Sequence, residues 1–327
     1  MLILDVSHLK NKKNLLAFSA GVDSSALFFL LIENNIKFDI AIVDYGIRDQ
    51  SKEEVNHTKE LAKKHKLFCH YIKAPIFDTH FEKQARDFRY EFFESLIMIK
   101  SYDTLITAHQ LGDQLEWLLM RLSKGAGVSE LLGLEPLSQR KDYILVRPLL
   151  AYSKEELLAY LKEHNYPFFV DVSNSDEKYE RNKFRKQFSD PLLLKYKEGI
   201  KRSFNYLRQD KVRLEKEFET IHSQKELRII KLHTPSAKVK ATDLALKELG
   251  YLLSSSQREE IEKENSLVIG GLWAVETQDD MLYITPYLTT NMPKNFKEKC
   301  RVLKIPSKIR AYCFKENINL SFLIPNS

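Results

Sequence analysis

The chain has 327 residues, of which 43% are hydrophobic and 29% are charged. This composition is ordinary for a globular protein, and it excludes a disordered or fibrous chain. The length exceeds that of a typical single domain, so we expect two structural units. No run of about 18 apolar residues spans a bilayer, and the start of the chain lacks the apolar length of a signal peptide, so we expect a cytoplasmic protein without a membrane partner.

Cysteine and charge patterns narrow the chemistry further. The three cysteines, Cys69, Cys300 and Cys313, form no C-x-x-C pair of the kind that binds zinc or exchanges disulfides, so we expect inert thiols in a reducing compartment. The formal net charge is +6, but residues 178–216 alone hold 13 Lys or Arg against 5 Asp or Glu. This segment is either a solvated helical face or a surface for a polyanion.

The first half of the chain alternates short apolar runs with longer amphipathic segments, which is the pattern of βαβ units and a mainly parallel sheet. Helices are expected between the predicted strands, which lie at residues 14–18, 38–43, 67–72 and 104–107. Capping boxes predict two of the helix starts, one at Ser51 with Glu54 and one at Ser153 with Glu156.

The second half has a different pattern. Its basic region, residues 190–216, has the apolar spacing of a helix. Beyond it we expect two short helices separated by residues 254–256, and then a hairpin over residues 267–287 with its turn near Asp279. The sequence therefore predicts an α/β fold in three parts, which are a parallel-sheet domain at 1–190, a basic helical connector at 191–220 and a small α+β domain at 221–327.

The segment F-S-A-G-V-D-S-S, residues 18–25, lies between the first predicted strand and an apolar helix. Parallel α/β sheets bind ligands beyond the carboxyl ends of their strands. Free N–H groups at a helix start, together with the hydroxyls of Ser19 and Ser24, suit a phosphate. Asp23 repels phosphate, so its natural partner is a bridging Mg²⁺. Taken alone, the segment is equally well a serine-capped turn.

Two other nucleotide-binding patterns are excluded. The chain has no G-x-x-x-x-G-K-[ST] sequence, so it has no Walker loop. The stretch G-A-G-V-S-E from Gly125 lacks the third glycine of a dinucleotide fingerprint and follows a helix, so we expect a helix C-terminal turn there.

Residues 18–25 resemble the S-G-G-x-D-S pyrophosphate loop of the N-type ATP pyrophosphatases, the PP-loop superfamily. Later segments resemble one family within it, tRNA(Ile)-lysidine synthetase. The similar segments are V-D-Y-G-I-R-D-Q-S-K-E-E, Q-A-R-D-F-R-Y-E-F-F, L-I-T-A-H-Q-L-G-D-Q-L-E-W-L-L-M-R-L-S-K-G-A-G, V-R-P-L-L-A-Y-S-K-E-E-L and D-V-S-N-S-D-E-K-Y-E-R-N-K-F-R. Together they cover residues 14–190, and the last is the most specific.

The resemblance implies an adenine nucleotide α-hydrolase-like fold and a ligase that uses ATP with Mg²⁺. It implies that the C2 oxygen of the wobble cytidine in the CAU anticodon of tRNA(Ile) is adenylated. Free L-lysine then displaces AMP, and pyrophosphate is the other product. The resemblance is also compatible with a homodimer.

The resemblance further implies roles for individual residues. The ATP-binding residues are Ser19, Ala20, Gly21, Val22, Asp23 and Ser24. The catalytic residues are Asp23, His109, Asp113 and Arg86, and two of these, Asp23 and Asp113, hold the metal. The residues for tRNA or phosphate are Arg89, Arg181, Asn182 and Arg185. Without the resemblance, a hydrogen-bonded strand-end histidine is the favoured interpretation of His109, and Arg86 and Arg89 are surface charges.

Five positions depart from the family pattern. Ala20 replaces the second loop glycine, which strains the backbone if this position requires a positive φ. The roles of the other four are open, since Tyr45, Gln110, Gly112 and Trp117 replace a His, a His, an Asp and a Thr. Two alternative functions also remain open. One is a tRNA thiolase, which generally needs paired cysteines or an iron–sulfur cluster, and the other is an RNA-binding module with a degenerate ATP loop.

Overall fold

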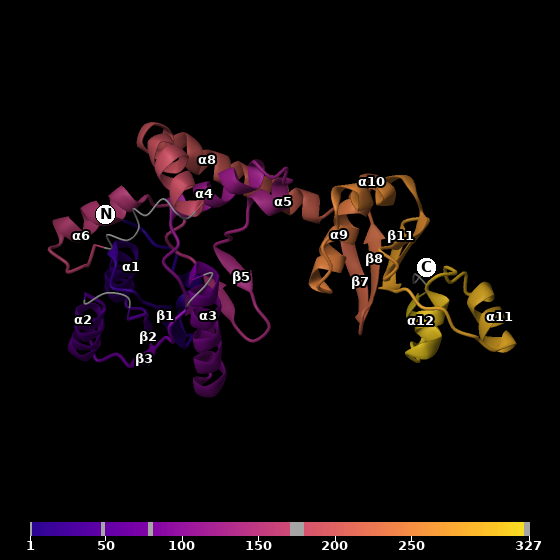
Figure 1. Ribbon diagram of the computed structural model, residues 1–327, viewed down its shortest axis with the longest axis horizontal. Helices are drawn as coiled ribbons and strands as arrows, with labels where there is room; N and C mark the ends of the chain where they lie inside the picture. The colour runs from indigo at the N-terminus through magenta and orange to yellow at the C-terminus, as the bar shows by residue number, and fades with distance from the viewer. Residues whose placement is uncertain (1, 47–49, 78–80, 171–179, 324–327) are drawn as a thin grey trace. The chain divides into compact units, whose positions relative to one another are not determined.

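The computed structural model describes residues 2–46, 50–77, 81–170 and 180–323. The chain forms two compact units, Met1–Arg208 and Gln209–Ser327. In Figure 1 the first unit runs from indigo to pink, and the second is orange to yellow. The first holds a mainly parallel sheet and the second an antiparallel sheet, so the predicted fold class is confirmed. None of the described helices is long and apolar enough to cross a membrane.

The sheet of the first unit has six strands in the order β3-β2-β1-β4-β6-β5. Five of them are parallel, and β5 pairs antiparallel with β6 at one edge. The strands are β1 Asn14–Ala17, β2 Phe38–Asp44, β3 Cys69–Lys73, β4 Thr104–Ile106, β5 Leu137–Gln139 and β6 Ile144–Val146. Because β1 and β4 are adjacent at the centre, the loops after these two strands meet at one edge of the sheet.

Helices connect the strands and cover both faces of the sheet. They are α1 Val22–Glu33, α2 Gln50–Lys64, α3 Phe81–Lys100, α4 Leu111–Leu122, α5 Val128–Leu131, α6 Lys154–Glu163, α7 Glu180–Phe184 and α8 Asp190–Glu215. A short 3-10 helix, Ser7–Leu9, precedes β1, and a π-helical turn, Arg185–Ser189, joins α7 to α8. Helix α8 is kinked at Tyr196.

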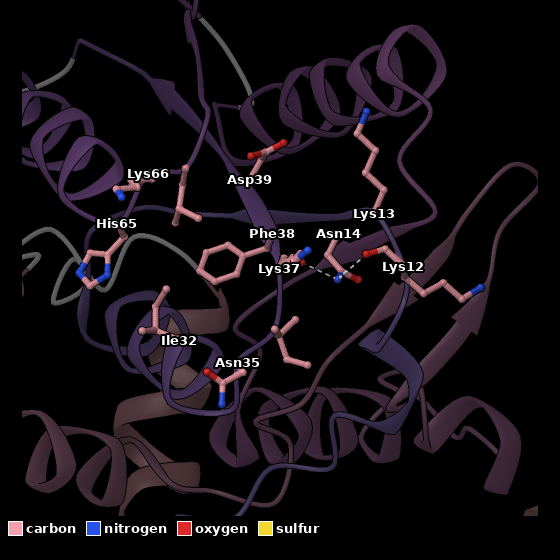
Figure 2. A pocket seen from close by; sticks show the side chains of 12 residues that line it. Lys12, Lys13, Asn14, Ile32, Asn35, Lys37, Phe38, Asp39, His65 and Lys66 are labelled. Atoms are coloured by element: carbon pink, nitrogen blue, oxygen red, sulfur yellow. Dashed lines mark hydrogen bonds between the residues drawn. The ribbon is translucent and has the colours of Figure 1, made fainter.

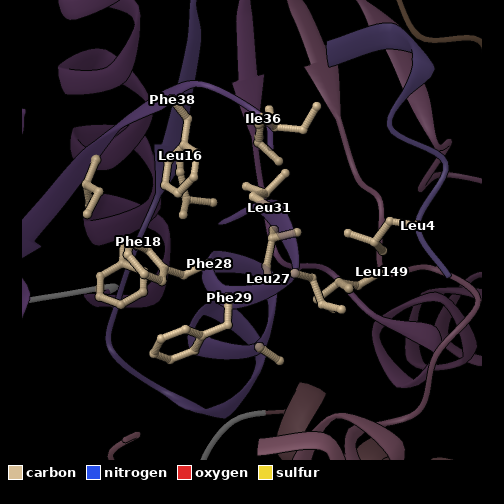
Figure 3. Close-up of a cluster of buried hydrophobic side chains, with 14 of the residues drawn as sticks. Leu4, Leu16, Phe18, Leu27, Phe28, Phe29, Leu31, Ile36, Phe38 and Leu149 are labelled. Atoms are coloured by element: carbon tan, nitrogen blue, oxygen red, sulfur yellow. The ribbon is translucent and has the colours of Figure 1, made fainter. Parts of the chain in front are cut away.

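Helices α1 and α6 bury their apolar side chains in one core with strands β1 and β2. Phe28 is fully buried at its centre and meets the ring of Phe38 edge to face at 5.4 Å (Figure 3). A separate core on the other face of the sheet includes Phe93 and Ile97 of α3. The apolar run of α1 therefore serves the core, while its first turn lies at the sheet edge.

The second unit is an antiparallel sheet with helices on both faces. Its strand order is β7-β8-β11-β10-β9. The strands are β7 Phe218–Gln224, β8 Leu227–Leu232, β9 Ser266–Ile269, β10 Trp273–Gln278 and β11 Met281–Pro286. The helices are α9 Lys238–Glu248, α10 Ser255–Lys263, α11 Lys294–Val302 and α12 Arg310–Lys315, and short 3-10 turns lie at Pro235–Ala237 and Leu320–Leu323. Helices α9 and α10 cover one core, and α11 and α12 cover the other.

Most of the predicted elements are confirmed. The four predicted strands match β1 to β4, the hairpin is β10–β11, and the capping box at Ser153 is present. Gly125 forms the predicted turn after α4, with a φ of 73°. The predicted helix start at Ser51 is wrong, because α2 already includes Gln50. Strands β5 to β8 were not predicted, since three of them are too short or too exposed to show an apolar alternation.

Candidate active site

The segment between β1 and α1 is a tight loop that its own serines hold in place. Gly21 is the N-cap of α1, and its carbonyl accepts bonds from Ser25 N and from Ser24 Oγ, the latter at 3.2 Å. The hydroxyls of Ser19 and Ser24 lie 3.1 Å apart. The first N–H groups of α1 therefore point to the sheet edge, where the helix dipole favours an anion.

Ala20 adopts the left-handed conformation that the family pattern assigns to glycine. Its φ is 59°, and its side chain is fully buried. Its carbonyl accepts bonds from Phe169 N at 2.9 Å and from Ser25 Oγ at 3.2 Å. An alanine in this region of φ costs about 1 kcal/mol, so these two bonds and the burial of the methyl group hold a strained residue in place.

A cavity of about 530 Å³ lies at the carboxyl ends of β1, β2 and β4. Five of the six predicted ATP-binding residues line it, and Ala20 is the exception, because it is buried behind the loop. The polar lining residues are Ser19, Asp23, Ser24, Asp44, Tyr45, Ser51, Glu54, Arg89, Tyr90, Thr107, His109 and Lys154. The loop after β1 and the loop after β4 thus face one space, as the topology requires.

Asp23 is the group in this cavity that best fits a divalent cation. Burial, and then the charge of Asp113, raise the pKa of Asp23 to about 7. Its Oδ1 atom is buried and has no hydrogen-bond partner in the described part of the chain. An unsatisfied buried carboxylate oxygen beside a second carboxylate is costly without a cation. The residues present therefore fit Mg²⁺, with Asp23 as a ligand.

His109 lines the cavity, whereas Asp113, in the first turn of α4, is not among the lining residues but is close enough to Asp23 to raise its pKa. Asp113 Oδ2 accepts the N–H of Gln110 at 2.9 Å in a capping box, and its Oδ1 accepts Nη2 of Arg181 at 2.5 Å. Burial opposes ionisation of Asp113, but its pKa is lowered, chiefly by the positive charge of Arg181. His109 precedes α4, so the two side chains do not share a helical face, yet they interact electrostatically.

The imidazole of His109 is held neutral. Burial is the main cause that lowers its pKa to about 4, and it outweighs the attraction of Asp113. Its Nδ1 lies 2.9 Å from Thr107 Oγ1, which orients the ring. At neutral pH His109 therefore offers one N–H donor and one acceptor rather than a positive charge.

The predicted tRNA or phosphate ligands of α7 and the π-helical turn face carboxylates instead. Arg181 bonds Asp113 and Glu116, and Arg185 Nε bonds Glu116 at 2.5 Å. Glu116, which is 1% exposed, receives both guanidinium groups. Asn182 lies between them on α7 and is half-buried. The cluster pins α7 to α4, and the segment 171–179 of the same motif lies outside the described residues.

The two predicted arginines of α3 separate in the structure. Arg89 lines the cavity and hydrogen-bonds the Tyr45 hydroxyl. Arg86 is exposed and lies over the Tyr90 ring at 5.7 Å, outside the cavity lining. Trp117 also lies outside the lining, and its Nε1 donates to the Glu130 carbonyl at 2.8 Å. Only Arg89 of these is placed to meet a ligand in the cavity.

One cationic lining residue was not predicted. Lys154 is the first residue of α6 and lies close enough to Asp23 to lower the pKa of that carboxyl. The sequence showed only the capping box that starts this helix. One signal could have indicated the role of Lys154. The lysine directly follows the N-cap of a helix that comes after a strand of the parallel sheet, and such helix starts lie at the ligand-binding edge.

A second hollow, of about 740 Å³, lies at the opposite edge of the sheet (Figure 2). Its lining includes exposed Lys12, Lys37 and Lys66. Helices α1 and α2 end here, so their dipoles present partial negative charge. The dashed bonds in Figure 2 run from buried Asn14 to the carbonyls of Lys12 and Lys37. The features of a phosphate site are therefore at the carboxyl edge, and this larger hollow lacks them.

Comparisons with known proteins identify the family. The PP-loop domain model matches residues 3–192. The chain is 45% identical over 318 residues to a tRNA(Ile)-lysidine synthase of Campylobacter jejuni (strain RM1221), covering 96% of each. It is 42% identical to the tRNA(Ile)-lysidine synthase of Wolinella succinogenes, covering 95% of each.

A solved structure supports the fold alone. The U34-tRNA thiolase NcsA from Methanococcus maripaludis, which has a [4Fe-4S] cluster, matches with a TM-score of 0.50 and 16% identity. The match covers 60% of this chain and 72% of the thiolase. Taken with the near-complete coverage of the curated relatives, the chain belongs to the tRNA(Ile)-lysidine synthase family of PP-loop proteins.

Proposed function

We propose that this protein is a ligase that joins free L-lysine to C2 of the wobble cytidine in tRNA(Ile) with a CAU anticodon, at the expense of ATP. The C2 oxygen attacks the α-phosphorus, and pyrophosphate leaves with the electron pair of the broken P–O bond. The ε-amine of lysine then attacks C2 and displaces AMP. The single observation that carries the proposal is that the Ser19–Ser24 loop, His109 and Asp23 line one cavity in a chain that matches a family member over 96% of its length.

The charges of the reaction explain the need for this cavity. ATP brings about four negative charges, and oriented N–H donors and cations stabilise them in the transition state. The N–H groups at the start of α1 and the hydroxyls of Ser19 and Ser24 supply donors. Asp23, with Asp113 as second carboxylate, would hold Mg²⁺, which neutralises phosphate oxygens when bound.

Neutral His109 suits the base rather than the phosphates. Because its pKa is about 4, the imidazole stays uncharged and donates or accepts a hydrogen bond at the cytidine edge. Arg89 is the lining residue of α3 that meets a phosphate, and Arg86 acts at the rim on the RNA backbone. Arg181 and Arg185 act through Asp113 and Glu116, with which they are paired.

The tRNA body requires a separate, larger surface. The basic connector, residues 191–220, and the α+β domain that follows it supply exposed cations for phosphate contacts, while the wobble base is unstacked for chemistry. A second copy of the chain is compatible with this arrangement.

The thiolase alternative lacks the cysteines that it needs. None of the cavity-lining residues of the described chain is a cysteine. Cys69 lies in β3, and Cys300 and Cys313 are buried in the second unit. A cluster held by paired cysteines therefore has no ligands at this cavity.

The test is ATP-dependent incorporation of radiolabelled lysine into unmodified tRNA(Ile) with a CAU anticodon. We expect one lysine per tRNA, with equal amounts of AMP and pyrophosphate. A tRNA with another anticodon and a reaction without ATP are the controls. If no lysine enters the CAU tRNA, or if pyrophosphate release is independent of tRNA, the ligase proposal is wrong. A protein that binds tRNA without consuming ATP would identify the degenerate RNA-binding module.

A further inference from the structure

Helix α6 brings one cation to the phosphate loop, at a position to which the sequence analysis gives no role. Helices α1 and α6 share a core and run side by side in the same direction. Their ends meet where the Tyr160 hydroxyl donates to Glu33 Oε1 at 2.7 Å, and their starts meet where Lys154 lies near Asp23. Lys154 is therefore positioned beside the first turn of α1, where the loop Ser19–Ser24 presents its donors.

The backbone of Lys154 is fixed on both sides. Ser153 N donates to Glu156 Oε2 at 2.7 Å, and Ser153 Oγ accepts from Glu156 N. Glu156 is held in turn by Lys197 at 3.2 Å and Lys201 at 3.0 Å. These contacts fix the start of α6 without using the Lys154 side chain.

The ammonium group of Lys154 has no ion pair or hydrogen bond within the described part of the chain. It lines the cavity, and the other formal cation among the lining residues is Arg89, because His109 is neutral. Asp23, Asp44 and Glu54 line the same space with negative charge. A polyphosphate that enters this cavity therefore meets two cationic side chains, and one of them is Lys154.

We propose that Lys154 binds the pyrophosphate portion of ATP and neutralises the leaving pyrophosphate during adenylation. This inference rests on the proposed function. The observation that selects a polyphosphate is that Lys154 lines the same cavity as Asp23 and the Ser19–Ser24 loop, whose hydroxyls and N–H groups are the donors of the proposed site. As the bond between the α-phosphorus and its bridging oxygen breaks, charge accumulates on that oxygen, and an ammonium there lowers the barrier.

The test uses Lys154→Met, Lys154→Arg and the control Lys162→Met, which removes an exposed lysine from the last turn of the same helix. Calorimetry with the full chain measures binding of inorganic pyrophosphate and of AMP, each with Mg²⁺. Thermal unfolding of each variant shows that the fold is kept.

We expect Lys154→Met to weaken pyrophosphate binding by about 10- to 100-fold and AMP binding by less than about threefold, since a charged hydrogen bond is lost only from the former. Lys154→Arg restores most of the affinity, and Lys162→Met leaves it unchanged. Equal pyrophosphate affinity in Lys154→Met, equal losses for both ligands, or no pyrophosphate binding by the unsubstituted chain would overturn the assignment. A chain that binds pyrophosphate through Lys154 but transfers no lysine would refute only the proposed function.

Discussion

The two edges of the parallel sheet each have a hollow with charged residues, but the charges are held differently. At the carboxyl edge, helices α1, α4 and α6 begin, and a buried carboxylate oxygen of Asp23 lacks a partner. At the amino edge, α1 and α2 end, Lys12, Lys37 and Lys66 are exposed to solvent, and the buried polar atom without a partner in the described chain is an imidazole nitrogen of His65 rather than a carboxylate oxygen. Water screens exposed charges, whereas buried unpaired groups act strongly on a ligand. A site for a cation and a phosphate is therefore marked by an unsatisfied buried carboxylate together with helix starts.

Asp23→Asn should break the carboxyl-edge site most severely. Loss of the charge that holds Mg²⁺ should reduce pyrophosphate release by about 1,000-fold or more, with tRNA retention largely intact. Single-turnover assays measure pyrophosphate release, and filter binding measures tRNA retention. Asp39→Asn at the amino edge is the matched control, because Asp39 accepts bonds from Phe68 N and Tyr102 and faces no ligand. Equal loss of release and tRNA retention would point to misfolding instead.

The same substitution should raise stability. The pKa of Asp23 in the folded state, about 7, is higher than the ordinary aspartate value, so the folded state binds the proton more tightly than the unfolded state does. Stability from this group is present at low pH and is lost as pH rises through the window from about 4 to 7. At pH 8, without metal, Asp23→Asn should therefore raise the free energy of unfolding by roughly 2–4 kcal/mol. A loss of stability at pH 8 would contradict the unpaired, buried state of this carboxylate.

Ala20 gives the next largest effect. A β-branched residue in the left-handed region is strongly disfavoured and overpacks a fully buried position, so Ala20→Val should destabilise the fold by about 3 kcal/mol and weaken ATP binding. Ala20→Gly should change stability by less than about 1 kcal/mol, because relief of strain is offset by lost burial and greater unfolded-state entropy. Urea unfolding compares the two. A stable, active Ala20→Val protein would show that the loop conformation is not required.

The sequence predicts what depends on local rules. The loop Ser19–Ser24, the turn at Gly125 and the cap at Ser153 are set by neighbouring residues, and all three lie where the pattern puts them. The position of Lys154 near Asp23 depends on the packing of α6 beside α1, which no short pattern contains. The same holds for Arg181, whose guanidinium is paired with Asp113 by tertiary folding.

The sequence also does not predict the sign of φ at Ala20. An alanine at position 20 leaves both signs of φ open, since the family glycine is absent. In the structure φ is positive, and the carbonyl of Ala20 accepts the N–H of Phe169, from a segment far along the chain. Strands β5 and β7 were missed for a related reason, because their pairing partners define them more than their side-chain pattern does.

The pH dependence of Mg²⁺ binding should sharpen the role of Asp23. Because its pKa is about 7 without metal, the ion displaces a proton below that pH. The apparent Mg²⁺ affinity should then fall by about tenfold per pH unit below pH 7 and level off above it. Calorimetry in two buffers of different ionisation enthalpy measures the released proton. His109 does not contribute to this window, since its pKa is about 4. An affinity that is flat between pH 5.5 and 8 would show that another group holds the ion.

The smallest effect should come from the amino edge. The double variant Lys12→Gln, Lys37→Gln removes two exposed cations from the larger hollow. Strand β1, residues Asn14–Ala17, separates this edge from the phosphate loop by roughly 13 Å, which exceeds the screening length of about 8 Å at physiological salt. We therefore expect pyrophosphate affinity and kcat/KM for ATP to change by less than about twofold. A tenfold loss at 0.15 M salt would mean that the amino edge contributes to ligand binding, and that exposed charge outweighs the helix dipoles there.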